Sequence, residues 1–381
     1  MDFNYDEEQQ ALREAVRGLV GKAYADFESR RQTVADDPGF SEKVWTQLAE
    51  MGILGLPFDE QHGGMGAGAV EVGIVAQELG RVLAPEPFLT SVVLAGGLVA
   101  AAGSEEQKGE LLGALSSGES VPTFAHAEPG SRWQPAASAV TATSSGDAWT
   151  LSGVKEPVPH GARADVLVVS AALPSGGTGL FVVRPDASGL TRVGYATHDG
   201  GRAAKVAFDA TPATPLGSAD DRTEIIARVV DIARVAACSE AVGAMEVALH
   251  TTSEYLKSRK QFGVTLNTFQ ALTFRAADMY VSLEEARSLA LWATMVLDDS
   301  ASGEQAAEAA SRASLGVSRA GRHIGQEAIQ LHGGIGMTAE YSIGSYTSHL
   351  TALDHLLGDG HHHLGLLAAG VAGYDEVDPL P

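Results

Sequence analysis

A run of side chains that can ligate metals lies near the end of the sequence, where Asp359 is followed by three consecutive histidines at positions 361–363. Neighbouring side chains on a helix diverge by about 100°, so these imidazoles cannot converge on one ion as an i, i+4 pair does. The single cysteine, Cys238, stands in an alanine-rich helical pattern without a matching His/Asn constellation, which is typical of a small buried side chain. The sequence therefore predicts neither a metal site nor a cysteine nucleophile.

Charge and motif content exclude several classes of protein. The 381 residues carry 26 Lys and Arg against 48 Asp and Glu, a net charge of −22 at pH 7, and so acidic a surface repels nucleic acid and anionic lipid. No G-x-G-x-x-G, Walker A or G-x-S-x-G motif is present, which argues against Rossmann, P-loop and α/β-hydrolase folds. The start, MDFNYDEEQQ, has neither the basic nor the apolar region of a signal peptide, and no apolar stretch is long enough to span a bilayer. We therefore expect a cytoplasmic protein.

The hydrophobic pattern changes twice along the chain. Residues 1–120 have apolar side chains at helical spacing, and residues 121–215 have short β-rich runs between Gly, Pro, Ser and Asp. This order predicts an N-terminal α domain, then a middle antiparallel β domain, then a C-terminal helical bundle over residues 216–381. The four bundle helices are predicted over 222–258, 268–298, 302–330 and 346–369.

The segments within this order resemble the acyl-CoA dehydrogenases over nearly the whole chain. The resemblance implies a mainly α fold with a central β domain, comprising an N-terminal helical domain, a middle β-barrel or sandwich and a C-terminal four-helix bundle. The matching segments are Trp45-Thr-Gln-Leu-Ala-Glu-Met-Gly-Ile-Leu-Gly-Leu-Pro57, His62-Gly-Gly-Met-Gly66, Gly103-Ser-Glu-Glu-Gln-Lys108, Glu128-Pro-Gly130, Arg259-Lys-Gln-Phe-Gly263 with Phe269-Gln270, and Gln330-Leu-His-Gly-Gly-Ile-Gly336.

The resemblance implies an FAD enzyme that removes the α-proton and the β-hydride of an acyl-CoA thioester. Such chemistry requires a carboxylate base at the α-carbon, hydrogen bonds to the thioester carbonyl, and flavin N5 facing the β-carbon. Members of this family bind FAD across a subunit interface, so that one flavin contacts two chains.

The part of the site that contacts a neighbouring subunit's flavin resembles the family pattern. An arginine at this position offers a planar fork of donors suited to a pyrophosphate, and a glycine pair lets backbone approach a ligand closely. The candidate cofactor-binding residues are Arg259, Gln261, Phe262, Leu266, Gln270, Gln330, Gly333 and Gly334.

The part that contacts the chain's own flavin departs from the family pattern. Typical members carry Thr-Glu-Pro-Gly-x-Gly-Ser where this chain has Ala127-Glu-Pro-Gly-Ser-Arg-Trp133. They carry Trp-Ile-Thr-Asn where this chain has Pro157-Val-Pro-His160, which removes an aromatic plane, a hydroxyl and backbone N–H groups.

The two positions that carry the base in the family hold apolar residues here, Leu357 and Ala233. Glu240 follows Ala233 by seven residues, two helical turns, and so lies on about the same face of the helix. Glu240 is therefore the candidate base within this chain, and its alternative role is an ordinary ion pair.

Three hypotheses follow from this pattern. In the first, the chain is a flavin-sharing subunit of a heteromeric acyl-CoA dehydrogenase, similar to the α2β2 enzymes of actinobacterial steroid side-chain degradation, and its partner is a second subunit of the same family. In the second, it is a self-sufficient homotetramer that uses Glu240 as base. In the third, it is a non-catalytic acyl-CoA-binding or scaffolding protein. A fourth hypothesis is that the chain is an oxidase or a monooxygenase of the same fold.

Overall fold

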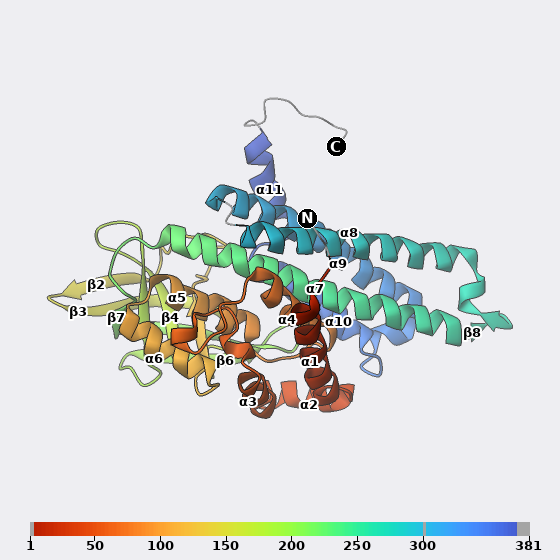
Figure 1. The fold of residues 1–381 in the computed structure, drawn as a ribbon, viewed down its shortest axis with the longest axis horizontal. Coiled ribbons are helices and arrows are strands. Elements are labelled where there is room, and N and C mark those ends of the chain that lie inside the picture. The colour runs from red at the N-terminus through yellow and green to blue at the C-terminus, as the bar shows by residue number, and fades with distance from the viewer. Residues whose placement is uncertain (1–3, 300–301, 372–381) are drawn as a thin grey trace.

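The computed structural model describes residues 4–299 and 302–371. A helical domain and a β domain lie below and beside a layer of long helices, and α7 runs along the molecule from the sheet to the β8 hairpin (Figure 1). This arrangement confirms the predicted fold class. The N-terminal helices are α1 (Glu7–Ala23), α2 (Phe27–Ala35), α3 (Glu42–Glu50), α4 (Ala69–Arg81), a π-helix (Phe88–Gly96), α5 (Gly97–Ala102) and α6 (Glu105–Ser116), with short 3-10 turns at Ile53–Gly55 and Glu60–His62.

The N-terminal domain forms one core with the inner ends of its neighbours. Val16 and Val20 on α1 and Leu48 on α3 are buried, as their helical spacing predicts. The π-helix is buried along its whole length and contacts β1, so the helical domain packs directly against this strand of the sheet. The N-terminal domain therefore forms one side of the space between the helices and the sheet.

The β domain is a closed barrel with two additional strands. Pairings run β4–β5, β5–β7, β7–β3, β3–β2 and β2–β4, which returns to the start, while β1 adds to β4 and β6 adds to β7. The sheet is mixed and not wholly antiparallel as the sequence predicts, because β1 pairs parallel with β4. The strands are β1 (Pro122–Ala125), β2 (Thr141–Ser145), β3 (Ala148–Pro159), β4 (Val166–Ala172), β5 (Thr178–Val183), β6 (Leu190–Ala196) and β7 (Arg202–Pro215).

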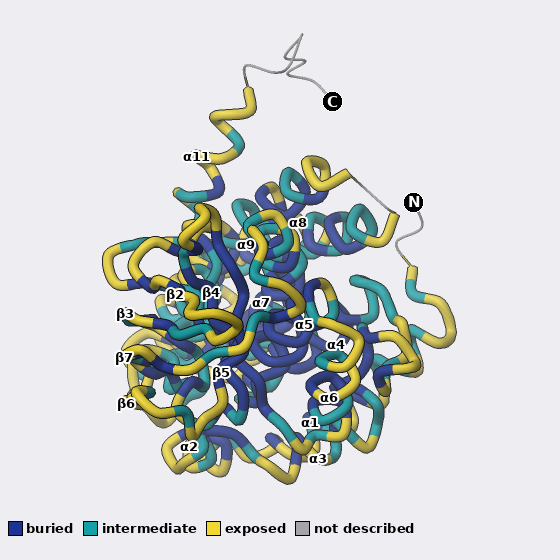
Figure 2. The backbone as a smooth tube through the Cα atoms, turned by 90° about the vertical axis from the view of Figure 1, so that its left-hand side faces the viewer, coloured by how far each residue is buried: buried dark blue, intermediate teal, exposed yellow. Residues whose placement is uncertain are grey.

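The strand β4 is apolar on both of its faces for a structural reason. Leu167 and Val169 point into the barrel core, whereas Val166 and Val168 pack against the N-terminal helical core. A strand that separates two cores needs a continuous apolar run, not alternation. Figure 2 accordingly shows β4 and α7 as the buried centre of the molecule.

The C-terminal helices pack around the long α7 (Thr223–Ser258). Its first half belongs to the N-terminal core and its second half to the bundle core, where small side chains such as Ala244 and Ala248 let helices approach closely. The remaining elements are the hairpin β8 (Lys260–Gln261) and β9 (Val264–Thr265), a 3-10 turn at Leu266–Thr268, α8 (Gln270–Asp298), α9 (Gly303–His332), a 3-10 turn at Gly333–Met337, α10 (Ile343–Leu356) and α11 (Gly360–Gly370).

The prediction of one continuous helix over residues 346–369 is wrong, because the structure has two helices there. The chain breaks after α10 at Gly358, whose φ of +131° favours glycine, and Asp359 then caps α11 by accepting a hydrogen bond from the His362 N–H at 2.8 Å. Hydrophobic spacing continues across this break and conceals it, whereas the Gly-Asp pair is the local signal.

We predict that Gly358→Ala destabilises the protein by about 1 to 3 kcal/mol, because the new Cβ needs an unfavourable φ and meets His363 Nε2 at 2.8 Å. The matched control is Gly365→Ala, which lies within α11 with open space around it and should be neutral or stabilising by about 0.5 to 1 kcal/mol. Urea unfolding of both variants measures the difference. Equal stability of the two variants would contradict this account of the break.

Candidate functional site

Two adjoining cavities lie where the helical domain, the barrel and α10 meet. The loop-side cavity, about 250 Å³, is bordered by the loop of residues 126–136, and the triad-side cavity, about 310 Å³, is bordered by Asp199, Glu240 and His349. Both cavities are predominantly apolar, as small-molecule sites usually are. Four residues contribute to both walls and so connect them: Thr90, Pro157, Pro159 and Leu356.

A buried ion pair shapes the loop of the loop-side cavity. Lys155, fully buried on β3, donates to Glu128 Oε1 at 2.8 Å, and the Glu128 carboxylate also accepts the backbone N–H groups of residues 138–140. Burial alone would raise the pKa of the Glu128 carboxyl, but the hydrogen bonds from Lys155 and the backbone lower it. Glu128 is therefore an ionised structural anchor for the loop, with its lone pairs used within the protein.

The same network determines the tautomer of His126 in the cavity wall. Its Nε2 lies 2.8 Å from the Gln134 carbonyl, which can only accept, so Nε2 carries the hydrogen. Nδ1 then accepts from the Ser170 hydroxyl at 2.8 Å, and Ser170 in turn accepts from Lys155. Burial lowers the pKa of His126 to about 4, so the ring is a neutral wall that stacks on Phe124.

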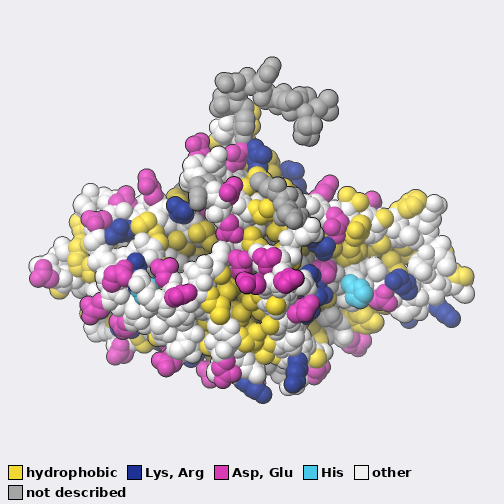
Figure 3. Space-filling model, viewed as in Figure 1, with side chains coloured by type: hydrophobic (Ala, Val, Ile, Leu, Met, Phe, Trp, Pro, Cys, Tyr) yellow, Lys and Arg dark blue, Asp and Glu magenta, His cyan; other side chains and the backbone are white. Residues whose placement is uncertain are grey.

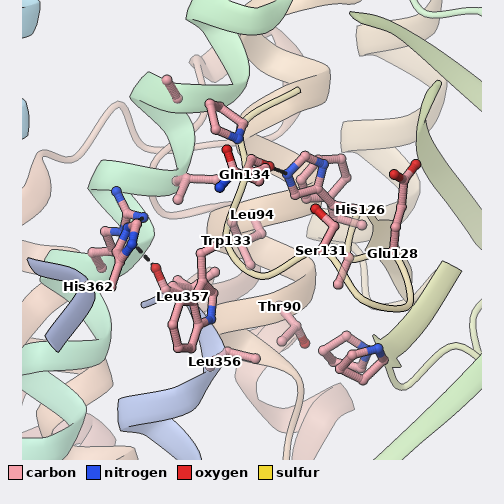
Figure 4. A pocket seen from close by; sticks show the side chains of 18 of the residues that line it. Thr90, Leu94, His126, Glu128, Ser131, Trp133, Gln134, Leu356, Leu357 and His362 are labelled. Atoms are coloured by element: carbon pink, nitrogen blue, oxygen red, sulfur yellow. Dashed lines mark hydrogen bonds between the residues drawn. The ribbon is translucent and has the colours of Figure 1, made fainter. Parts of the chain in front are cut away.

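Trp133 crosses from this loop to the C-terminal helices. Its indole N–H donates to the His355 carbonyl at 3.0 Å, and its ring lies 5.4 Å from that of His362. Figure 4 shows Trp133 beside Leu356 and Leu357 within the cavity. The only donor of this side chain is thus already engaged and is not available to a bound ligand.

The end of β3 presents two proline rings to both cavities. Pro157 and Pro159 are two residues apart and therefore lie on the same side of the strand, while Val158 between them is fully buried. Neither proline has an N–H to donate, and neither side chain carries a polar atom. This wall can pack against a flat ring but cannot donate a hydrogen bond to it.

The structure separates the positions that the resemblance associates with a base. Leu357 lines the loop-side cavity, and its carbonyl accepts a hydrogen bond from Arg234 Nε at 2.8 Å. Ala233 is fully buried in the helical core and lines neither cavity, so it does not share a pocket with Glu240 although their spacing predicts about the same helix face. Glu240 lies in the wall of the triad-side cavity.

Glu240 belongs to a triad that the sequence analysis misses. His349 Nε2 lies 2.9 Å from Glu240 Oε1, and His349 Nδ1 lies 3.1 Å from Asp199 Oδ2. Both carboxylates only accept, so both ring nitrogens donate and the imidazole is protonated. Burial alone would lower the pKa of His349, but its hydrogen bonds to Asp199 and Glu240 raise it to about 9. The three members come from α7, α10 and the loop before β7, and no sequence spacing relates them.

The candidate residues for a neighbour's flavin lie together at the far end of the bundle. Arg259 ends α7, and the hairpin carries Gln261 and Phe262, whose ring is 90 % exposed. Leu266 follows the hairpin, half-buried, and Gln270 is exposed at the start of α8. Within the described residues the Arg259 side chain forms no ion pair or hydrogen bond.

The second part of this group reaches the same end from α9. Tyr255, one turn before Arg259, stacks on His332 with ring centroids 4.4 Å apart, which brings the ends of α7 and α9 together. Gln330, Gly333 and Gly334 are exposed there. Gly333 has a φ of +67°, and a Cβ at either glycine would meet nothing within 4 Å, so the backbone is open to a ligand.

The remaining chemically active side chains have structural surroundings. Burial raises the pKa of the Cys238 thiol to about 12, far from that of a reactive cysteine. His362 faces Trp133 and His363 is buried, whereas His361 is exposed, so the three rings diverge. Residues 4–299 and 302–371 contain no group of three or more His, Cys, Asp or Glu side chains that could hold a metal ion, and no helix within them could cross a membrane.

Comparison with known proteins establishes the class. A family model for the N-terminal domain of acyl-CoA dehydrogenases matches residues 6–119, and a model for the C-terminal domain matches residues 223–372. The chain belongs to the acyl-CoA dehydrogenase family, whose chemistry is FAD-dependent dehydrogenation of acyl-CoA thioesters.

Individual relatives match over almost the full length. The chain is 31% identical to acyl-CoA dehydrogenase IpdE2 of Mycobacterium tuberculosis, over 89% of this chain and 90% of the relative. It is similar in structure to the Tcur3481–Tcur3483 steroid ACAD, with 33% identity, a TM-score of 0.87 and coverage of 96% and 98%. It is also similar to the ChsE4–ChsE5 complex of Mycobacterium tuberculosis, with 26% identity, a TM-score of 0.89 and coverage of 99% and 100%.

The residues at the bundle end fit part of an FAD molecule. An unpaired Arg259 guanidinium, the amides of Gln270 and Gln330, and the open backbone of Gly333 and Gly334 are suited to its phosphates and polar groups. When bound, FAD supplies the hydride acceptor of the family reaction. At the end of β3, the cavities of the same chain present flat apolar surface from Pro157 and Pro159.

We predict that the stabilising effect of His349 fades as pH rises. The folded pKa of about 9 lies above the unfolded value of about 6.5, so the contribution is complete below about pH 6.5 and is lost as pH approaches 9. The difference in unfolding free energy between wild type and His349→Gln should therefore narrow by about 2 to 3 kcal/mol from about pH 6 to about pH 9.5.

Urea denaturation at both pH values measures this difference. His250→Gln serves as control, because His250 is an exposed histidine of the same bundle with no hydrogen bond to its ring among the described residues. A stability difference for His349→Gln that is the same at both pH values would refute a protonated bridge.

Proposed function

We propose that the chain is a flavin-sharing subunit of a heteromeric acyl-CoA dehydrogenase, which contributes its bundle end to a flavin held mainly by a partner of the same family. The partner supplies the catalytic carboxylate, and the acyl group is bulky and steroid-like. The tetrameric α2β2 assembly is part of this proposal.

The observation that carries the proposal is the separation between the two candidate parts of the cofactor site. Arg259 follows Arg234, which lines the loop-side cavity, by 25 residues of one helix, which corresponds to about 37 Å along its axis. A flavin in the chain's own cavities would therefore not reach the chain's own Arg259. The donors at the bundle end are useful only to a flavin in another chain.

An exposed apolar surface adjoins those donors and supports association with a second chain. It consists of Phe262, Val264, Phe274, Val281 and Met337, which are between 41 % and 90 % exposed. Phe274 and Val281 are two helical turns apart on α8 and so lie on one face. Figure 3 shows hydrophobic side chains at this end of the molecule. Apolar surface of this kind commonly marks an interface.

The residues around the cavities of this chain support the proposal that a partner subunit supplies the catalytic base and most of the flavin contacts. The usual base positions hold Leu357 and Ala233, and the Glu240 carboxylate accepts a hydrogen bond from a protonated histidine. Pro157 and Pro159 supply no donor, and the Trp133 N–H is engaged with His355. The similarity to the ChsE4–ChsE5 complex and to a steroid ACAD favours a heteromer and a steroidal acyl group.

A second candidate is a self-sufficient homotetramer with Glu240 as base. Its support is the position of Glu240 in the wall of the triad-side cavity. The hydrogen bond from His349 argues against it, because Glu240 Oε1 already accepts a hydrogen bond from a proton-bearing nitrogen at 2.9 Å and is not free to take a proton from a substrate.

We predict that the flavin-containing assembly carries one FAD per two chains, and that Arg259→Ala lowers its affinity for FAD about ten- to a hundred-fold. The physical reason is the loss of a charge-assisted contact, worth about 1.5 to 3 kcal/mol. Flavin absorbance per chain after gel filtration measures both quantities. Lys260→Ala removes an adjacent exposed cation and should have a much smaller effect. One FAD per chain, or full flavin retention in Arg259→Ala, would falsify flavin sharing through this residue.

We predict that Glu240→Gln changes turnover by no more than a few-fold and leaves the flavin content unchanged, because the amide retains an acceptor for His349. Steady-state dehydrogenation of an acyl-CoA with an artificial electron acceptor measures this. A loss of about 10² to 10⁴-fold with flavin retained is the result expected of a general base, and it would replace our proposal with the homotetramer.

A further inference from the structure

Three aromatic rings pack together at the end of the bundle that carries Arg259, beside β8 (Figure 1). Tyr255 stacks on His332 with their ring centroids 4.4 Å apart and their planes 24° from parallel. Tyr341 lies edge-on to both rings, 5.9 Å from Tyr255 and 5.5 Å from His332. These rings, here called the ring cluster, come from the last turn of α7, the last residue of α9 and the segment that leads into α10, so they join three parts of the chain.

His332 contributes a neutral ring to this cluster. Its Nδ1 lies 2.7 Å from the Ala328 carbonyl, which can only accept, so Nδ1 carries the hydrogen. Burial lowers the pKa of His332 and so favours the uncharged ring, in which Nε2 has no hydrogen. Nε2 is buried and has no hydrogen-bond partner among the residues that the structure describes. The imidazole is 4 % exposed and therefore interacts with its surroundings chiefly by packing of its flat faces.

The residues that flank the ring cluster are among those proposed to contact the flavin of another chain. The Arg259 N–H donates to the Tyr255 carbonyl at 2.8 Å, so the arginine follows directly from the helical turn that carries the ring. Gly333 follows His332 in the chain, and the next turn packs back on that histidine, because a Cβ at Gly336 would lie 3.0 Å from His332 Cβ. The position of Arg259 relative to Gly333 therefore depends on how the two rings stack.

The Arg259 side chain has no contact of its own that could replace this alignment. Within the described residues it forms no ion pair or hydrogen bond, whereas its backbone carbonyl accepts the Leu266 N–H at 2.9 Å. A cofactor that binds both the guanidinium and the glycine backbone needs them at one separation, held to within about 0.5 Å by the packing of neighbouring side chains. The ring cluster supplies such packing, because two of its members lie four residues before Arg259 and one residue before Gly333.

We propose that the ring cluster sets the separation between Arg259 and the glycine pair, and that Tyr255 and His332 are positioning residues for FAD. This inference rests on the proposed function, because it takes the bundle end as part of another chain's flavin site. The buried His332 ring acts on the cofactor through the residues that it aligns. Stacked aromatic pairs hold their partners beyond what burial of area alone provides, so loss of the stack loosens both sides of the site.

The test compares FAD affinity with stability in the purified flavin-containing assembly. His332→Leu and Tyr255→Leu each remove the stack and keep an apolar side chain, and we expect each to raise the FAD dissociation constant about three- to ten-fold. The double variant should bind FAD no more than about two-fold more weakly than the weaker single variant, because both changes remove one contact. Fluorescence of FAD released on serial dilution gives the dissociation constants, and urea unfolding gives the stability.

Two further variants separate positioning from a general structural role. His332→Phe keeps a flat ring and buries no polar nitrogen, so its FAD dissociation constant should stay within about two-fold of the wild-type value. Trp149→Leu is the control for loss of an aromatic pair elsewhere, since the Trp149 ring lies 5.4 Å from that of Phe181 in the barrel. It should lower the stability and leave the affinity for FAD unchanged.

The outcomes separate the inference from the proposed function. Wild-type FAD affinity in folded His332→Leu or Tyr255→Leu, with weakened binding in Arg259→Ala, overturns the inference and leaves the proposed function in place. Equal losses in His332→Phe and His332→Leu, additive losses in the double variant, or a loss of FAD affinity in Trp149→Leu overturn it too. Wild-type affinity in Arg259→Ala overturns flavin sharing through that residue, and the inference with it. If His332→Leu fails to fold, Tyr255→Leu decides, because Tyr255 is only half-buried.

Discussion

The length and rigidity of α7 constrain the rest of the molecule. This helix of 36 residues, about 54 Å long, lines both cavities with its first half and delivers Arg259 and the hairpin at its other end. It approaches α4 closely because both helices carry glycine at the contact: a Cβ at Gly80 would lie 2.0 Å from the Glu240 carbonyl, and one at Gly243 would lie 2.0 Å from the Gln77 carbonyl. The same contact that holds Glu240 at the cavity therefore keeps the Arg259 end of the helix away from it, which is the geometry that the proposed flavin sharing requires.

Two buried charge networks complete the site by joining elements that are distant in the chain. Lys155 and Glu128 tie the cavity loop to the barrel interior, and His349 joins Asp199 of the β domain to Glu240 of the bundle. Charges in such surroundings are tolerated only when every one of them is paired and hydrogen-bonded, so each network also fixes the relative position of its elements.

Local patterns in the sequence predict much of the architecture. Helical spacing identifies α1, α3 and most of the bundle, and glycine and proline mark the short strands of the barrel. The two errors have one cause, since spacing reports burial and not connectivity. It runs through Gly358 and so conceals the break between α10 and α11, and it cannot tell that β1 pairs parallel with β4.

The sequence by itself determined the family, the chemistry of that family, and the group of exposed donors around Arg259, because these depend on contiguous motifs whose residues need only local backbone geometry. Tertiary structure alone decided which polar groups meet. Glu240 and His349 are 109 positions apart, and Glu86 meets Tyr24 across 62, separations that carry no periodic signal. Whether a carboxyl group is a base or an ion-pair partner depends on its burial and on its neighbours from other elements, and both arise only when the helices and the barrel pack together.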